Sequence, residues 1–260
     1  MLIQALRLEE ARLISLCGAG GKTSLMFALA REFVSAGERV LVTTTTKIAT
    51  EEAEGPWPSF AAGSAQQVLE QAQRLLPEGA RGREGAVIAF SARGDTRLTG
   101  FAPELVDSVS ASRHFDRILV EADGSARKPL KAPATHEPVI PSASDALVIV
   151  AGLNGLGLPL DEEHVFRAKI WAQLSGIEVG SPVTPESLAR VVAHPEGLAR
   201  GCPEHARRVL FFNRADTPER RAAAKQAAEF LASAPVHGLD LAVSGCLLPE
   251  TAIIDVFPFA

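Results

Sequence analysis

The sequence predicts an α/β fold with a doubly wound, mostly parallel sheet and helices on both faces. Short runs rich in Val, Ile and Leu recur at wide intervals, and they are continuous rather than alternating, as expected of strands buried on both faces of a parallel sheet. Helical patterns separate these runs, which is the order of elements in doubly wound folds. The predicted strands are residues 13–17, 40–44, 86–90, 117–121, 146–151 and 209–213.

The first predicted helix, residues 23–36, shows the helical pattern most clearly. Leu25, Leu29 and Phe33 recur at a spacing that makes one apolar face, and Gly37 stands where a helix would end. Further helices are expected at residues 64–76, which Pro77 ends, and at 103–112, 162–175, 185–193 and 218–233.

Two segments interrupt this alternation. Residues 54–63 form the clearest irregular stretch, and residues 124–143 form a loop with four prolines that is too long to be a bare connection. We expect a single domain that spans residues 1–260, with irregular insertions near 54–63 and 124–143.

Composition narrows the class of partner. The chain has 260 residues, of which 47% are apolar and 22% charged, as in soluble globular proteins. Its net charge of −5 gives no general attraction to nucleic acid or to an anionic membrane, so small molecules or proteins are the expected partners. The three cysteines lack C-x-x-C spacing, and neither a secretory signal nor a bilayer-spanning stretch is visible, so a cytoplasmic location is expected.

A glycine-rich loop, S-L-C-G-A-G-G-K-T at residues 15–23, joins the first strand to the first helix. Backbone without side chains can turn its N–H groups toward phosphate, and the helix that follows offers its positive end. This context favours a phosphate-binding loop (P-loop) over a ligand-free glycine turn, although Leu16 replaces the first glycine of the usual G-x-x-x-x-G-K-[ST] pattern. The predicted nucleotide-binding residues here are Gly18, Ala19, Gly20, Gly21, Lys22, Thr23 and Ser24. Cys17, just before the loop, is interpreted as a buried small apolar residue rather than a reactive thiol.

Two carboxylates stand at the end of the predicted strand at residues 117–121. Glu121 and Asp123 stand at the same edge of the sheet as the glycine loop, and alternate residues of a strand point the same way. We expect Thr23 and Asp123 to hold Mg²⁺, Glu121 to orient water, and Lys22 to stabilise charge on the outer phosphates. The alternative is a pair of solvated carboxylates at a strand end.

Basic and hydroxyl groups supply candidates for a second site. Arg127, Lys128 and Lys131 could neutralise phosphate or an anionic second substrate, although a solvated basic surface explains them as well. In the T-T-T-T-K run that ends the second strand, Thr45, Thr46 and Lys47 are candidates for contact with Mg²⁺ or phosphate, but four threonines are also good strand formers.

The predicted strand at 209–213 ends in N-R-A-D, which resembles the N-K-x-D of GTP-binding proteins. Asp216 could accept two hydrogen bonds from guanine, with Asn213 beside it. The same residues also make a good entry to the helix at 218–233. Residues 242–246, A-V-S-G-C, could supply backbone N–H groups to the base carbonyl.

Together these segments resemble the YqeC family, which is described as accessory proteins of selenium-dependent molybdenum hydroxylases. The resemblance is carried by I-S-L-C-G-A-G-G-K-T-S-L-M, V-T-T-T-T-K-I, L-T-G-F-A-P-E-L-V-D, D-R-I-L-V-E-A-D-G-S-A-R-K-P-L-K-A-P-A, H-E-P-V-I-P, H-V-F-R and F-N-R-A-D. It implies a P-loop NTPase fold and a role in maturing a molybdenum hydroxylase that contains labile selenium. It also draws attention to His136, Glu137, His164 and Arg167.

We therefore expect a Mg²⁺-dependent nucleoside triphosphatase that prefers GTP to ATP and serves the maturation of such a hydroxylase or its cofactor. The expected partners are the nucleotide and a hydroxylase or maturation protein, and the chain could pair as a homodimer. Two alternatives stay open: a kinase or nucleotidyltransferase acting on a pterin or molybdenum cofactor, and a non-catalytic, nucleotide-dependent chaperone.

Overall fold

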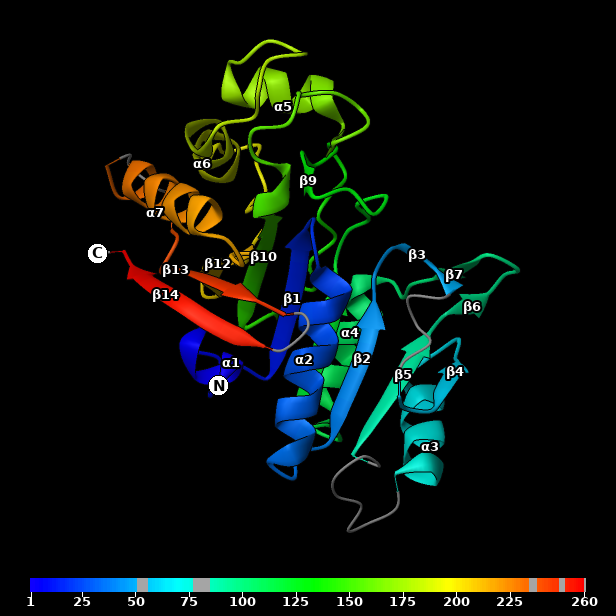
Figure 1. Ribbon diagram of the computed structural model, residues 1–260. Helices are drawn as coiled ribbons and strands as arrows, with labels where there is room; N and C mark the ends of the chain where they lie inside the picture. The colour runs from blue at the N-terminus through cyan, green and yellow to red at the C-terminus, as the bar shows by residue number, and fades with distance from the viewer. Residues whose placement is uncertain (51–55, 77–84, 234–237, 248–250, 260) are drawn as a thin grey trace.

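The computed structural model describes residues 1–50, 56–76, 85–233, 238–247 and 251–259. The described residues form a sheet of nine strands in the order β14-β13-β12-β10-β1-β8-β2-β5-β4 (Figure 1). All neighbouring strands of this sheet are parallel except β13 and β14. The strands are β1 Leu13–Gly18, β2 Val40–Thr44, β4 Ser59–Ala61, β5 Ala86–Phe90, β8 Arg117–Glu121, β10 Ala146–Gly152, β12 Arg207–Asn213, β13 Leu241–Cys246 and β14 Ala252–Pro258.

Helices cover both faces of the sheet, which confirms the predicted fold class. One apolar cluster joins α1 and α2 to one face, and two further clusters join the remaining helices to the other. Neighbouring residues of a strand enter different clusters: Ile14 and Leu16 pack with α2, while Leu13 packs on the opposite face. The helices are α1 Leu2–Ala5, α2 Lys22–Ser35, α3 Ala65–Leu75, α4 Pro103–Ala111, α5 Ala168–Ser175, α6 Pro185–Ala193 and α7 Pro218–Ser233, with a 3₁₀ turn η3 at Leu153–Gly155.

Helix α2 ends as the sequence predicts. Gly37 has a φ of +85°, and its N–H donates to Val34 O at 2.9 Å. The next N–H, that of Glu38, donates to Phe33 O at 3.1 Å, so the two bonds satisfy carbonyls that the helix leaves open.

Two small sheets lie outside the central one. One consists of β3 Lys47–Ala49, β7 Arg97–Thr99 and β6 Ala92–Arg93, and the other pairs β9 Leu130–Lys131 with β11 Val165–Phe166. In Figure 1, β9 lies beyond the carboxyl ends of β1 and β10. The loop predicted at 124–143 therefore contains a short strand, and it passes over the edge of the sheet where the glycine loop lies.

Three details of the sequence-based prediction are corrected. The segment 54–63 is not irregular throughout, because residues 59–61 form the edge strand β4, while residues 54–55 and Pro77 lie outside the described residues. The helix predicted at 162–175 begins only at Ala168, because residues 165–166 form the strand β11 and Arg167 has a φ of +67°, outside the helical region. Residues 242–246, considered as a source of backbone N–H groups for the base, lie within the strand β13.

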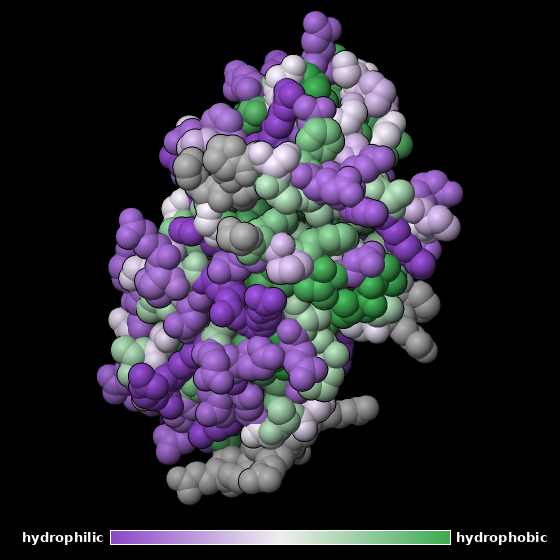
Figure 2. Space-filling model, turned by 90° about the vertical axis from the view of Figure 1, so that its left-hand side faces the viewer, coloured by the Kyte–Doolittle hydropathy of each residue, from purple (hydrophilic) through white to green (hydrophobic). Residues whose placement is uncertain are grey.

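The surface beside α7 and β14 combines polar and apolar regions. Figure 2 views the molecule from the side on which Figure 1 places these two elements, and it shows a band of apolar residues between polar areas. β14 is the last strand at its end of the central sheet. No helix among the described residues is long and apolar enough to cross a membrane.

Candidate functional site

A large cleft lies where several parallel strands end. Its volume is about 1130 Å³, and it is lined by the glycine loop, the start of α2, the residues that follow β2, β8 and β12, and the loop at 124–139. Parallel strands bring their carboxyl ends to one edge of a sheet, and this edge is the usual binding site of doubly wound folds. The cleft thus gathers segments that are far apart in the sequence.

The glycine loop, residues 18–21, follows β1 in a conformation that side chains would obstruct. Gly18 has a φ of +95°, and a Cβ there would lie 2.2 Å from Val150 O. Gly20 has a φ of +83°, and a Cβ there would lie 2.5 Å from main-chain atoms of Gly152 and Pro129. Both positions require glycine, because the positive φ strains a residue that has a side chain and the close approach leaves no space for a Cβ.

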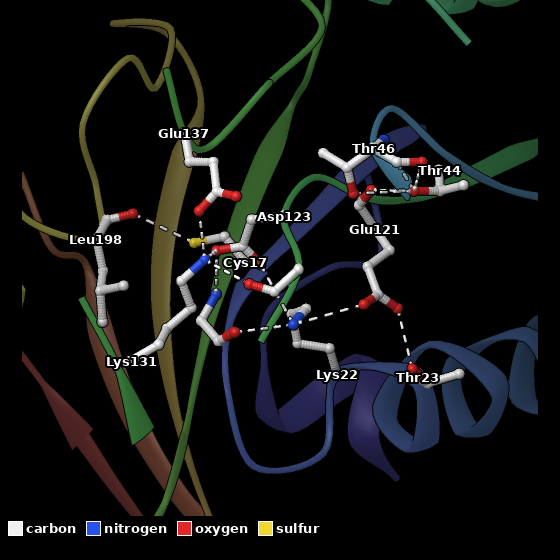
Figure 3. Close-up of polar contacts among 12 residues, drawn as sticks. Cys17, Lys22, Thr23, Thr44, Thr46, Glu121, Asp123, Lys131, Glu137 and Leu198 are labelled. Atoms are coloured by element: carbon white, nitrogen blue, oxygen red, sulfur yellow. Dashed lines mark hydrogen bonds and ion pairs between the residues drawn. The ribbon is translucent and has the colours of Figure 1, made fainter. Parts of the chain in front are cut away.

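Lys22, the first residue of α2, is buried at the floor of the cleft. Its ammonium donates to Gly18 O at 2.8 Å and lies 3.5 Å from Glu121 Oε1 and 3.3 Å from Asp123 Oδ1 (Figure 3). Burial alone would lower the pKa of Lys22, but the charges of Asp123 and Glu121 outweigh it, so the pKa is raised. Lys22 is therefore a firmly charged ammonium that two carboxylates hold beside the glycine loop.

The two carboxylates that the sequence singles out occupy different surroundings. Glu121 lines the cleft, and its Oε2 accepts a hydrogen bond from Thr23 Oγ1 at 3.0 Å (Figure 3). Asp123 is fully buried and is not among the lining residues; its Oδ2 accepts from Gly18 N–H at 3.0 Å and lies 2.7 Å from Lys131 Nζ. Glu121 and Thr23 thus place two adjacent oxygen ligands at the cleft, and the metal role expected for Asp123 stays a prediction that this geometry does not favour.

Buried charges continue from Asp123 to the far end of the loop at 124–139. Lys131 Nζ lies 2.7 Å from a carboxylate oxygen of Glu137, and it also donates to Gly124 O at 2.7 Å. The guanidinium of Arg167 donates two hydrogen bonds, of 2.6 and 3.1 Å, to the same Glu137 carboxylate. Burial would raise the pKa of Glu137, but the hydrogen bonds from Arg167 and the charge of Lys131 lower it to about 2.

We call this series, Lys22, Asp123, Lys131, Glu137 and Arg167, the ion-pair chain. Its signs alternate from one residue to the next, so each buried charge has a partner. Chemistry alone did not single out Glu137 and Arg167; the family resemblance drew attention to both. Glu137 and Arg167 lie 30 positions apart in the sequence, so no local sequence pattern predicts that they form an ion pair.

The residues expected to recognise the base do not act together. Asn213 ends β12, lines the cleft and donates through its side-chain amide to Gly20 O at 2.7 Å. Asp216 is exposed, is not among the lining residues, and forms an ion pair with Arg220 at 2.6 Å. That hydrogen bond from Arg220 lowers the pKa of Asp216. Asn213 thus fixes the glycine loop, whereas a guanine contact by Asp216 stays a prediction.

The other candidates divide between the cleft and its surroundings. Thr45 donates through its hydroxyl to Val139 O at 2.6 Å, which ties the end of β2 to the long loop. Lys131 is buried behind the lining, and His164 pairs with Asp161 at 2.8 Å outside it. Cys17 is buried, donates to Leu198 O at 3.2 Å, and has its pKa raised by burial, so it is a packed residue as expected. The candidates that line the cleft are Gly20, Gly21, Lys22, Thr23, Ser24, Thr45, Thr46, Lys47, Glu121, Arg127, Lys128, His136, Glu137, Arg167 and Asn213.

Comparison with known proteins shows which family this chain resembles. The model of a family described as YqeC protein matches residues 14–169, a range that contains the glycine loop, both carboxylates and the whole ion-pair chain. A protein of Escherichia coli strain K12, named "Uncharacterized protein YqeC", is 35% identical over 207 residues, which cover 79% of this chain and 77% of that protein.

Proposed function

Because the chain belongs to the YqeC family, we propose that it is a Mg²⁺-dependent nucleoside triphosphatase that serves as an accessory factor in the maturation of a selenium-dependent molybdenum hydroxylase or its cofactor. The accessory role in this proposal follows the role ascribed to the family. The Mg²⁺-dependent triphosphatase activity is inferred from the residues of the cleft.

The observation that carries the proposal is the buried ammonium of Lys22 beside a glycine loop that opens a helix. Gly21 is the N-cap of α2, and no described side chain caps the helix. The first N–H groups of a helix have no partner within it, and together with the helix dipole they favour an anion. Lys22 adds a full positive charge at the same place. A triphosphate tail is the polyanion that suits this combination.

Mg²⁺ fits the residues at the edge of the cleft. It prefers oxygen ligands, and it is commonly held by a hydroxyl that follows a phosphate-binding lysine and by a carboxylate at the end of a neighbouring strand. Thr23 and Glu121 meet both descriptions, and their oxygens already lie 3.0 Å apart. When bound, Mg²⁺ would neutralise charge on the phosphate oxygens. Lys22 would hold the same oxygens from the side of the loop, and the carboxylate oxygen of Glu121 that does not contact the ion would be available to orient a water.

GTP stays the favoured nucleotide through the N-x-x-D sequence of residues 213–216. For Asp216 to accept the guanine edge, its carboxylate would have to exchange the Arg220 guanidinium for the base. Arg214 and Leu247 line the cleft next to Asn213, so a base has both a cationic and an apolar surface to pack on.

Calorimetric titration tests this function directly. Non-hydrolysable GTP and ATP analogues would be titrated into the protein with and without Mg²⁺, and orthophosphate release from GTP and ATP would be followed separately. Lys22→Ala should weaken binding by about ten- to a hundredfold, the cost of losing a charged hydrogen-bond donor to phosphate. The matched control is Lys225→Ala, since Lys225 is an exposed lysine of α7 outside the cleft. A folded protein, verified by circular dichroism, that binds neither analogue in the presence of Mg²⁺ would refute the proposal.

A further inference from the structure

The cleft carries more positive charge than one nucleotide needs. Among the described residues that line it, seven are lysine or arginine and two are glutamate, an excess of five positive charges, although the whole chain has a net charge of −5. A nucleoside triphosphate with its Mg²⁺ carries roughly two negative charges at neutral pH, because the divalent ion cancels about half of the charge of the phosphates. The seven cations are Lys22, Lys47, Arg97, Arg127, Lys128, Arg167 and Arg214.

The size of the cleft points the same way. Its volume of about 1130 Å³ exceeds the ~300–1,000 Å³ that is usual for a site holding one drug-sized ligand. The glycine loop and Thr23 account for the part of the cleft that would take the triphosphate. The loop at 124–139 and the turn before α5 extend the cleft beyond the part that would take the triphosphate. No residue of these two segments has been assigned to the nucleotide.

Backbone strain marks the cations in this extension. Arg127 has a φ of +59° and Arg167 a φ of +67°. Among the other described arginines, Arg214 lines the cleft after β12 with a φ of +66°, whereas Arg7 and Arg113 also have a positive φ but do not line the cleft. The left-handed region is rare for residues other than glycine, and strained residues concentrate at functional sites. Both segments of the extension therefore hold an arginine of the cleft lining in a costly conformation.

The ion-pair chain holds one of these arginines in place. Arg167 uses three of its N–H donors on Glu137 and on Ala132 O, and its guanidinium stacks over the Phe166 ring at 4.3 Å. A guanidinium has five N–H donors, so these contacts orient it without exhausting it. Lys128 is likewise oriented by a bond of 2.6 Å to Glu163 O, and an ammonium has three donors. His136 also lines the cleft, and its side chain is exposed.

We propose that Arg127, Lys128, His136 and Arg167 form a second anion subsite, which binds a small molecule carrying a phosphate or similar oxyanion while the nucleotide occupies the glycine loop. This proposal extends the proposed function and rests on it, since the two sites share one cleft. Arginine and lysine groups fixed by their neighbours are the usual binding partners of phosphate oxygens. The ligand of this subsite is the second substrate or the effector of the nucleotide reaction.

The test measures anion binding with the glycine loop already filled. The protein is saturated with Mg²⁺ and with the imido analogue of GTP or ATP that it binds more tightly, and inorganic phosphate or ribose 5-phosphate is then titrated and followed by ³¹P NMR. Both probes should bind with one site per chain. The double variant Arg127→Ala/Lys128→Ala should weaken this binding by about tenfold or more, as expected for the loss of charged hydrogen-bond donors, and should change the affinity for the analogue by less than about twofold.

The control separates a built site from diffuse attraction. Arg31→Ala/Lys225→Ala removes the same charge from exposed positions outside the cleft and should change phosphate binding by less than about threefold, because only general electrostatics are altered. Equal weakening by both double variants would overturn the subsite, as would the absence of phosphate binding to the analogue-saturated wild type. Binding of inorganic phosphate but not of ribose 5-phosphate would also overturn it, because the site would then hold only the product of hydrolysis. If the analogue itself does not bind, the proposed function fails and the subsite with it, so the two failures are distinguishable.

Discussion

Replacing Glu137 with glutamine tests the energetic role of the ion-pair chain. Glu137 is 8% exposed and takes three charge-assisted contacts, one from Lys131 and two from Arg167. The fall of its pKa from 4.5 to about 2 corresponds to about 3 kcal/mol of stability at neutral pH, at roughly 1.4 kcal/mol per pH unit. Glutamine keeps the shape but not the charge. Glu137→Gln should therefore lower the free energy of unfolding by about 3 kcal/mol at pH 7, which is the size expected when one partner of a buried ion pair is removed.

The pH dependence of this difference follows from the sign of the shift. A carboxyl whose pKa is depressed in the folded state contributes stability that is present above its unfolded pKa and is lost as the pH falls through its folded pKa. For Glu137 this window runs from pH 4.5 down to about 2. The gap between wild type and Glu137→Gln should thus stay constant from pH 7 to 5.5 and narrow to about 2 kcal/mol by about pH 3.5.

Urea unfolding followed by circular dichroism at each pH measures this gap. Glu229→Gln serves as the control, because Glu229 is exposed and lies 3.9 Å from the equally exposed Lys225, and such pairs contribute roughly 0–1 kcal/mol. A loss below about 1 kcal/mol for Glu137→Gln at pH 7 would refute the reasoning, because it would put the buried pair on the scale of a surface pair. A gap of constant size between pH 5.5 and 3.5 would refute it as well.

Three further predictions concern the glycine loop and its surroundings. Gly20→Ala should weaken nucleotide binding in calorimetry by at least about tenfold, because its Cβ would collide with main-chain atoms, whereas Gly37→Ala, with a similar positive φ but open space, should lose about 1 kcal/mol of stability and no affinity. Glu121→Gln should abolish the Mg²⁺ dependence of nucleotide binding and Asp123→Asn should retain it while lowering stability; the reverse result would return the metal role to Asp123. Asp216→Ala should equalise the affinities for GTP and ATP analogues, and an unchanged preference would show that residue 216 does not read the base.

Much of the fold can be predicted from the sequence because a parallel sheet leaves a strong pattern. Continuous apolar runs, each followed by a helix-period segment, set the number and type of most elements, and the strands at 40–44, 86–90 and 117–121 begin and end where expected. The glycine loop is equally local, since its glycines, lysine and threonine are consecutive. The short strands β3, β6, β7, β9 and β11 were not predicted, because two or three residues are too few to show a period.

The site was only partly predictable, because the contacts that organise it are not local. Strand alternation predicts that Glu121 and Asp123 face one site together, and both do contact Lys22. β8 ends at Glu121, however, so alternation no longer governs Asp123, which is buried against Gly18 and Lys131 instead. Whether a carboxylate just after a strand is buried depends on which residues of the following loop pack over it. Here that loop places the ammonium of Lys131, eight residues further along the chain, against Asp123.

This second ammonium explains how Asp123 can be buried beside a lysine that must also serve a ligand. Phosphates that reach Lys22 would draw its ammonium away from Asp123, to which it lies 3.3 Å at closest. If Lys22 were the sole counter-charge, ligand binding would leave a fully buried carboxylate unpaired, at a cost of several kcal/mol. Lys131 lies nearer to Asp123, at 2.7 Å, and is itself held by Glu137. Asp123 therefore keeps Lys131 as a partner whichever way Lys22 points. The ion-pair chain thus allows Lys22 to turn toward phosphate without leaving an unpaired carboxylate in the core.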